Sequence, residues 1–212
     1  TGGAGSIGKT TAKLFLEAGA KVLLVDIAET TLKEAVKGLK NENVKYCVAD
    51  VTKEKEVQHY ITETVKLFGK IDIFFNNAGI EGVVKPLIDY PIDEFDKVIA
   101  VNVRGTWLGN KYALPHMNDG GSIIMTSSVA GILGFAGLSA YVTSKHAVVG
   151  IMRATAIEAA PHKIRVNTVN PAPVNNRMMR SIEENASPGN SEDVKKEFDS
   201  LNIYCIESQK IK

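Results

Sequence analysis

Hydrophobic and polar positions follow two different periods along most of the chain. Short apolar runs bounded by glycine, asparagine or charged residues predict buried strands, whereas apolar positions recurring every three or four residues predict amphipathic helices. The predicted helices cover residues 7–20, 29–40, 53–69, 91–117 and 141–160. The predicted strands cover residues 21–26, 44–50, 70–79, 121–128 and 163–171.

This alternation of strands and helices is typical of βαβ units. We therefore predict an α/β fold of the Rossmann type, a doubly wound parallel sheet with helices on both faces and ligands at the carboxyl ends of the strands. Residues 1–212 are interpreted as one domain, because this length suits a single core. Beyond Pro173 the pattern loosens, so residues 177–200 are expected to form a substrate lid and residues 201–212 an atypical tail.

Composition narrows the range of functions. The formal net charge is +1, and Lys and Arg are interspersed with Asp and Glu, so no nucleic-acid partner is expected. No apolar run approaches the ~20 residues that a membrane helix needs, so no membrane partner is expected either. Cys47 and Cys205 form no paired motif, which favours a reduced, cytoplasmic protein, and the histidines show no metal-ligand spacing, so no metal is predicted.

The opening residues, TGGAGSIGKT, fit two phosphate-binding patterns. Residues 3–10 match G-x-x-x-x-G-K-[ST], which holds the phosphates of ATP or GTP, and residues 3–8 match G-x-G-x-x-G, which holds the pyrophosphate of a dinucleotide. Both patterns use glycine because backbone N–H groups then approach the phosphate closely, at the N-terminus of the next helix. A strand normally feeds such a turn, so the first strand of the sheet is expected to be missing from this chain.

Asp26 favours the dinucleotide. It ends the strand after the turn, where a dinucleotide fold places the acid that binds the adenosine ribose hydroxyls. A carboxylate there repels a 2′-phosphate, and Ile27 offers no cation to bind one, so NAD is favoured over NADP. A phosphate-hydrolysing enzyme that uses Asp26 to bind Mg²⁺ is the less favoured alternative.

Motifs further along the chain are more specific. Tyr141 and Lys145 are four positions apart and share one helix face, where the ammonium group is expected to lower the pKa of the phenol. The chain also carries, in this order, TGGAGSIG, Asp50-Val51, NNAG at 76–79, Asn102, Ser128, Tyr141-Val142-Thr143-Ser144-Lys145 and Asn170-Pro171. With these motifs the chain resembles the short-chain dehydrogenase/reductase family from Thr1 to about Phe198, including its NAD-dependent alcohol dehydrogenases and 3-oxoacyl-carrier-protein reductase-like members.

The resemblance implies an oxidoreductase that transfers a hydride between NAD(H) and a secondary alcohol or ketone. Tyr141 would act as acid and base, and Lys145 would also hold the nicotinamide ribose. Ser128, rather than Ser127, would bind the substrate oxygen. Asn102 would hold a water that links Lys145 to solvent.

The resemblance also implies a set of cofactor-binding residues and a homotetramer or homodimer for the full-length protein. The cofactor-binding set is Gly2, Gly3, Gly5, Ser6, Ile7, Gly8, Asp26, Asp50, Val51, Asn77, Ala78, Gly79, Tyr141, Lys145, Pro171, Val174 and Asn176. Asp50 has a structural alternative as an N-cap of the following helix. Asn76 is expected to steady the neighbouring strands.

Three positions depart from the family pattern. Ser6 stands where glycine is usual, Ala172 follows Pro171 in place of glycine, and Asn176 replaces a threonine that often binds the nicotinamide carboxamide. Because Asn offers the same kinds of hydrogen bond, it is expected to substitute for that threonine.

The C-terminal residues LNIYCIESQKIK do not resemble the final helix and strand of the family. Two hypotheses follow. The chain is either an NAD-dependent enzyme, or an inactive fragment or nucleotide-binding remnant without a closed substrate pocket. The motifs do not identify the substrate, and the preference for NAD favours alcohol oxidation.

Overall fold

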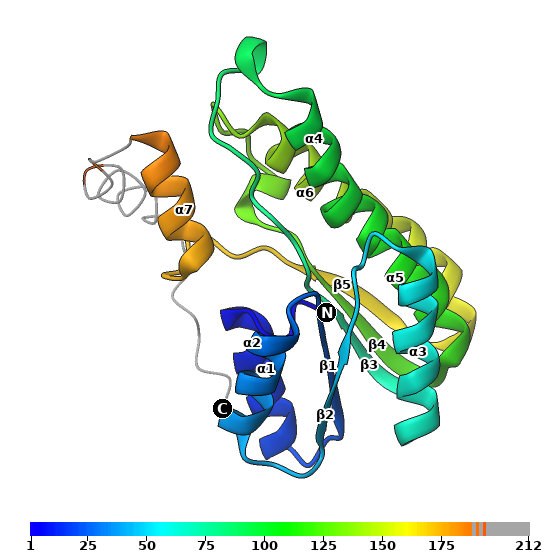
Figure 1. Cartoon of the computed structure of the whole chain (residues 1–212). Coiled ribbons are helices and arrows are strands. Elements are labelled where there is room, and N and C mark those ends of the chain that lie inside the picture. The colour runs from blue at the N-terminus through cyan, green and yellow to red at the C-terminus, as the bar shows by residue number, and fades with distance from the viewer. Residues whose placement is uncertain (188–189, 191–192, 194–212) are drawn as a thin grey trace.

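The computed structural model describes residues 1–187, 190 and 193. Strands and helices alternate as predicted, in an α/β fold of the Rossmann type (Figure 1). The helices are α1 (Ser6–Glu17), α2 (Glu29–Leu39), α3 (Glu54–Phe68), α4 (Ile92–Ile99), α5 (Thr106–Ala113), α6 (Ser139–Ala159) and α7 (Arg177–Ala186). The strands are β1 (Val22–Asp26), β2 (Val44–Val48), β3 (Ile71–Asn76), β4 (Met117–Thr126) and β5 (Arg165–Val169). The predicted tail, Cys205 and most of the predicted lid after residue 187 lie outside the described residues.

All strand pairs are parallel and fall into two groups. β1 pairs with β2, and β3, β4 and β5 pair in that order. In one apolar cluster, side chains of α1 and α2 pack on β1 and β2. In a larger cluster, side chains of α3, α5 and α6 pack against the strands (Figure 1). Within the part of the chain that the structure describes, no helix is both long and apolar enough to cross a membrane.

The predicted helix 91–117 differs from the structure in its interior and at its end. A π-helical turn, Ala100–Gly105, separates α4 from α5, and a 3₁₀ turn, Leu114–His116, ends the run. Pro115 lies in this last turn, and it lacks the N–H that a longer α-helix would need. Met117 therefore begins β4 instead of ending the helix.

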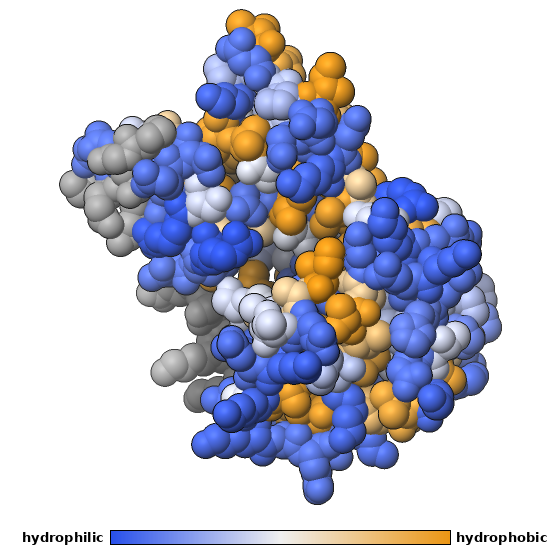
Figure 2. Space-filling view, viewed as in Figure 1, coloured by the Kyte–Doolittle hydropathy of each residue, from blue (hydrophilic) through white to orange (hydrophobic). Residues whose placement is uncertain are grey.

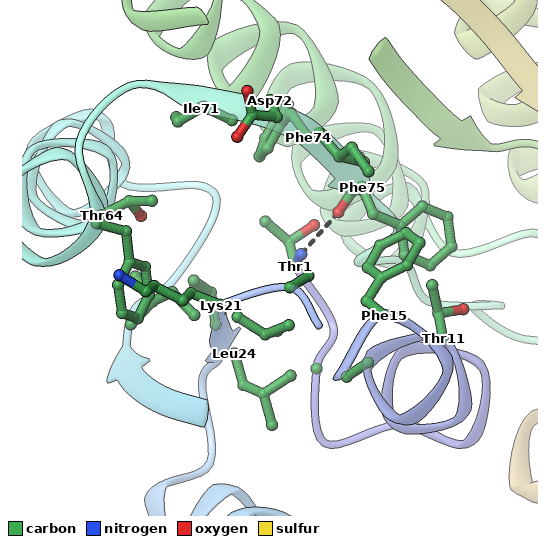
Figure 3. Close-up of a pocket in the computed structure, with 18 of the residues that line it drawn as sticks. Thr1, Thr11, Phe15, Lys21, Leu24, Thr64, Ile71, Asp72, Phe74 and Phe75 are labelled. Atoms are coloured by element: carbon green, nitrogen blue, oxygen red, sulfur yellow. Dashed lines mark hydrogen bonds between the residues drawn. The ribbon is translucent and has the colours of Figure 1, made fainter. Parts of the chain in front are cut away.

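A cavity of about 410 Å³ separates β1 from β3 (Figure 3). Both strands line it, together with apolar side chains of α1 and α3 such as Phe15 and Ile61. The turn residues bridge the two strands at one end, because the Thr1 nitrogen donates to the Phe75 carbonyl at 2.8 Å and the Gly3 N–H donates to the Val25 carbonyl at 3.0 Å. The cavity thus has the position expected for a strand that feeds the glycine turn.

Lengthening the chain at Thr1 by five valine or isoleucine residues should raise the free energy of unfolding. Such an extension would bury apolar side chains in the cavity and pair with both inner strand edges, which should stabilise the fold by about 2 kcal/mol or more after its ordering cost. Urea unfolding followed by circular dichroism measures this difference. A Gly/Ser extension of equal length is the control, and equal stability of the two extended proteins would contradict the expectation.

Candidate active site

Tyr141 and Lys145 lie on the first turns of α6, where both are buried. The Lys145 Nζ lies 5.4 Å from the centroid of the Tyr141 ring and donates to the Thr126 carbonyl at 2.9 Å. Because Thr126 ends β4, this bond ties the start of α6 to the carboxyl end of the central strand of the three-stranded sheet. The two residues with the predicted chemistry therefore lie where a parallel sheet places its ligand site.

The two neighbouring serines have different environments. The Ser128 hydroxyl accepts from the Ala130 N–H at 3.1 Å, and Ser128 lies near enough to Tyr141 to lower the pKa of the phenol. The Ser127 hydroxyl instead donates to the Lys145 carbonyl at 2.9 Å, which fixes it in a structural contact. Of the two serines, Ser128 is the one that acts on the phenol.

The predicted lowering of the Tyr141 pKa by Lys145 is wrong for this arrangement. Burial raises the pKa of Tyr141, the hydrogen bond with Ser128 opposes this, and the nearby Glu81 carboxylate raises the pKa further. Burial also lowers the pKa of Lys145 to about 8. Both groups are thus shifted toward their uncharged forms, so desolvation outweighs the mutual attraction that the spacing suggested.

Asn102 lies in the π-helical turn with almost no exposed surface. Its amide accepts from the Ile80 N–H and donates to the Ile80 carbonyl, both at 2.8 Å, and also donates to the Ser144 hydroxyl at 2.9 Å. The side chain therefore joins the segment after β3 to α6. π-helical turns of this kind often occur at functional sites.

The glycine turn is closely packed and ends at the N-terminus of α1. A Cβ atom on Gly8 would lie 2.2 Å from the Gly2 carbonyl oxygen, so only glycine fits there, and Gly2 has a positive φ of +63°. The Asp26 carboxylate accepts from the Ala4 N–H at 3.0 Å and the Ile27 N–H at 2.8 Å. The N–H groups at the start of a helix, with a carboxylate at the neighbouring strand end, suit the pyrophosphate and ribose of a dinucleotide.

NNAG carries the contacts that anchor this turn. The Thr1 hydroxyl accepts from the backbone N–H groups of Asn77 and Ala78, both at 3.0 Å, and the Asn77 side chain accepts from Thr126 at 2.9 Å. Asn76 donates to the Thr106 carbonyl at 2.8 Å and to Asn110 at 3.1 Å, so its amide joins β3 to α5 rather than to the neighbouring strands. A Cβ atom at position 79 would lie 3.2 Å from the Asn102 Oδ1 and 3.3 Å from the Lys145 Nζ, so Gly79 passes close to both side chains.

The remaining predicted cofactor residues have structural contacts of their own. The Asp50 carboxylate accepts from the Thr52 N–H at 2.8 Å in a turn before α3, whose N-cap is Lys53, so Asp50 is not the N-cap. The Asn176 side chain accepts from the Met179 N–H at 3.0 Å and caps α7. One lone pair of its oxygen is therefore engaged, which leaves the NH₂ group and the second lone pair for a carboxamide.

Six further residues were predicted to bind the cofactor. Val51 packs beside Gly105, the Pro171 carbonyl accepts from the Val129 N–H at 2.9 Å, and Val174 is 39% exposed before α7. Gly5 is exposed at the N-cap of α1, where Ser6 and Ile7 follow in the first turn.

Sequence reasoning missed three contributors to this site. Thr126 binds Lys145, and Ser144 binds Asn102. Ser144 lies within the Tyr141–Lys145 motif but had no predicted role, and the only signal for Thr126 was its place two residues before Ser128. Glu81 is buried close to Tyr141, and the signal was an isolated acid among the apolar residues after NNAG.

This arrangement is that of a nucleotide-dependent oxidoreductase acting on alcohols or ketones. The chain belongs to the short-chain dehydrogenase family, because the family model described as short chain dehydrogenase matches residues 1–187. It is 37% identical to levodione reductase of Leifsonia aquatica over 208 residues, which span 95% of this chain and 78% of that protein. It is 41% identical to secoisolariciresinol dehydrogenase of Forsythia intermedia over 174 residues, which span 81% of this chain and 63% of that protein.

Solved structures agree with this assignment. A crystal structure of levodione reductase matches with a TM-score of 0.90 at 37% identity, over 95% of this chain and 80% of that chain. A crystal structure of NAD⁺-bound xylitol dehydrogenase matches with a TM-score of 0.86 at 31% identity, over 94% of this chain and 82% of that chain. The Rossmann-type fold predicted from the strand and helix pattern is thus confirmed.

Replacing Lys145 by methionine should stabilise the fold at pH 7. Lys145 is protonated there in both the folded and the unfolded protein, and its pKa falls from 10.5 to about 8 on folding, so burying the ammonium costs on the order of 3 kcal/mol. We expect Lys145→Met to be about 1–3 kcal/mol more stable at pH 7, after loss of the hydrogen bond to Thr126. This gain should shrink as pH rises from 8 toward 10.5, where the lysine becomes neutral in both states.

Urea unfolding at pH 7 and at pH 10 measures both effects. Lys9→Met, at an exposed position of α1, is the matched control and should change little. A Lys145→Met protein that is less stable than the parent at pH 7 would contradict the expectation.

Proposed function

We propose that this protein interconverts a secondary alcohol and a ketone with NAD(H), with Tyr141 as the residue that moves the proton. The observation that carries this proposal is the arrangement of Tyr141: its phenol is buried, and the Lys145 ammonium lies 5.4 Å from its ring and is held by the Thr126 carbonyl at the carboxyl end of β4. The glycine turn and Asp26 supply a dinucleotide site at the carboxyl ends of the neighbouring strands.

The residues of the site have separable tasks. NAD, when bound, accepts a hydride from the alcohol carbon or returns it to the ketone carbon. The Ser128 hydroxyl donates a hydrogen bond to the substrate oxygen. Tyr141 donates its proton to that oxygen as a ketone becomes an alcohol, or removes the proton in the reverse direction. Asn102 holds the backbone of Ile80 in the segment beside Tyr141 and Lys145. Lys145 supplies an ammonium group whose pKa of about 8 lies close to neutral pH.

Asp26 supports NAD as the preferred cofactor. Its carboxylate is held by two backbone N–H groups at the tip of β1, beside the turn. A 2′-phosphate placed there would meet this negative charge, and the adjacent Ile27 brings no positive one.

The environment of Tyr141 bears on the direction of the reaction. A raised pKa keeps the phenol protonated at neutral pH, which suits the proton donor of ketone reduction. Oxidation requires the deprotonated form and would therefore be favoured at alkaline pH. The preference for NAD had favoured oxidation, whereas the raised pKa of Tyr141 favours reduction. We propose reduction as the favoured direction at pH 7.

An inactive remnant is the less supported hypothesis. Met178 of α7, Phe135 and Val84 pack against the apolar cluster that contains Tyr141 and Leu138. These contacts give the reacting group an apolar wall, as a substrate site requires.

The free, buried Cys47 suits a reducing compartment, and we propose a cytoplasmic location, which fractionation of the source cells would test.

Two substitutions test the proposed chemistry and cofactor. Tyr141→Phe removes the proton donor and should lower kcat about 10²–10⁴-fold for reduction of neutral cyclic ketones such as cyclohexanone, measured as NADH consumption. Asp26→Ala removes the ribose acceptor and should weaken NADH binding about tenfold, measured by fluorescence transfer from Trp107. Tyr46→Phe, remote from the site, is the matched control. Unchanged turnover in Tyr141→Phe, or tighter binding of NADPH than of NADH by the parent protein, would contradict the proposal.

We also propose that copies of the chain associate through the apolar tip that precedes α4. Leu87, Ile88 and Ile92 are 76%, 92% and 80% exposed there, and Figure 2 shows hydrophobic side chains at this end of the molecule. Exposed apolar residues that are neighbours in sequence are typical of contact surfaces between subunits.

Light scattering after size-exclusion chromatography tests this surface. The parent protein should elute as a dimer or tetramer, and Ile88→Asp should shift it toward the monomer because a charge would be buried in the contact. Lys85→Asp, close by on the same segment, is the control. A monomeric parent protein would disprove the proposal.

A further inference from the structure

Glu81 is a buried carboxylate that the proposed chemistry does not use. Its side chain is only 10% exposed, and it follows directly after Ile80, whose N–H and carbonyl are both held by Asn102. Its backbone is thus fixed by the same amide that contacts α6. The position of Glu81 is therefore as well defined as that of the catalytic residues.

The carboxylate of Glu81 has little compensation within the described residues. Its one contact is an ion pair of 3.7 Å with Arg177 of α7, longer than a hydrogen bond, and the Arg177 side chain is 81% exposed. A carboxylate can accept about four hydrogen bonds, and burying its charge without them is costly. Glu81 thus has unused capacity to accept hydrogen bonds.

Glu183 shows what a purely structural buried carboxylate looks like in this protein. It is also buried, but Arg180 donates to it at 2.5 Å, and the same Arg180 donates to Asn175 at 2.9 Å. That ion pair is short and is supported by a further hydrogen bond. No comparable short ion pair or hydrogen bond among the described residues supports the Glu81 carboxylate.

Glu81 lies near the place at Tyr141 where the substrate is proposed to bind. The Asn102 amide that holds Ile80 also donates to the Ser144 hydroxyl, which donates to the Tyr141 carbonyl at 2.8 Å, so one side chain joins the segment of Glu81 to the helix turn of Tyr141. Val84, three residues after Glu81, and Met178, next to Arg177, both pack against the cluster that contains Tyr141. A molecule held at Tyr141 would meet apolar walls and a single carboxylate.

Resting on the function proposed above, we propose that Glu81 is a substrate-binding residue that accepts a hydrogen bond from a second hydroxyl group of the substrate, so that the preferred substrates are uncharged diols and hydroxyketones. A negatively charged substrate is repelled by the carboxylate. A positively charged one is disfavoured because Arg177 lies beside the carboxylate and already offsets part of its charge. The apolar walls accept the carbon skeleton between the two oxygens.

A series on one rigid ring tests this assignment. The substrates are cyclohexanol, the 1,2-, 1,3- and 1,4-cyclohexanediols, 3-hydroxycyclohexanecarboxylate and 4-aminocyclohexanol, each oxidised with NAD⁺ at pH 9. We expect kcat/KM for at least one diol to exceed that for cyclohexanol by about tenfold or more, mainly through KM, because a hydrogen bond to a buried carboxylate is strong. The anionic substrate should be the poorest of the set.

Two variants separate substrate binding from a structural role. Glu81→Met keeps the volume of the side chain but removes the acceptor, and it should bring the diol-to-cyclohexanol ratio of kcat/KM down to about one. Arg177→Met breaks the same ion pair from the α7 side. If Glu81 only fastened α7, both variants would affect all substrates alike, whereas binding of a hydroxyl predicts that Arg177→Met keeps the diol preference.

The outcomes are distinguishable from failure of the proposed function. Oxidation of cyclohexanol and the diols at equal efficiency by the parent protein overturns the role of Glu81 and leaves the dehydrogenase intact, even if Glu81→Met does not fold. A preference for 4-aminocyclohexanol overturns the uncharged substrate class. Absence of NAD⁺ reduction with every substrate, and of NADH binding, overturns both proposals.

Discussion

The buried amide of Asn102 is the interaction on which the site depends. It satisfies both backbone groups of Ile80 and the hydroxyl of Ser144, so one side chain joins the loop after β3, the π-helical turn and α6. Since an unpaired buried polar group is costly, these three segments have strongly preferred relative positions. The places of Lys145, one residue after Ser144, and of Glu81, one residue after Ile80, follow from this junction.

Burial changes the pKa values of the two titratable groups at the centre of the site. Tyr141 and Lys145 are each shifted toward the neutral form, the phenol to a higher pKa and the ammonium to a pKa of about 8. Lys145 thus titrates nearer to neutral pH and exchanges a proton more readily, whereas Tyr141 holds its proton more firmly at neutral pH. A fold that keeps a lysine in such a place gives up stability, as is common where a site is built for function.

Much of the fold could be predicted from the sequence, because the strands are short buried runs and most helices have clear amphipathic periods. The predicted end of the helix at residue 117 was wrong, since the π-helical turn and Pro115 depend on local contacts that periodicity does not encode. Spacing also placed Tyr141 and Lys145 on one face, but it could not give their degree of burial, which decides the direction of both pKa shifts. The contacts of Thr126, Ser144 and Glu81 arise from the packing of distant segments, and Asn176 proved to cap a helix.

The most direct measurement of the central claim follows the hydride itself. NADH carrying deuterium on one face of the nicotinamide C4 is supplied with a neutral cyclic ketone, and the alcohol is analysed by mass spectrometry. The account predicts one deuterium on the carbon that bears the new hydroxyl when one face is labelled, and none when the other face is labelled. Alcohol without deuterium in both cases, or no alcohol from folded protein that binds NADH, would contradict it.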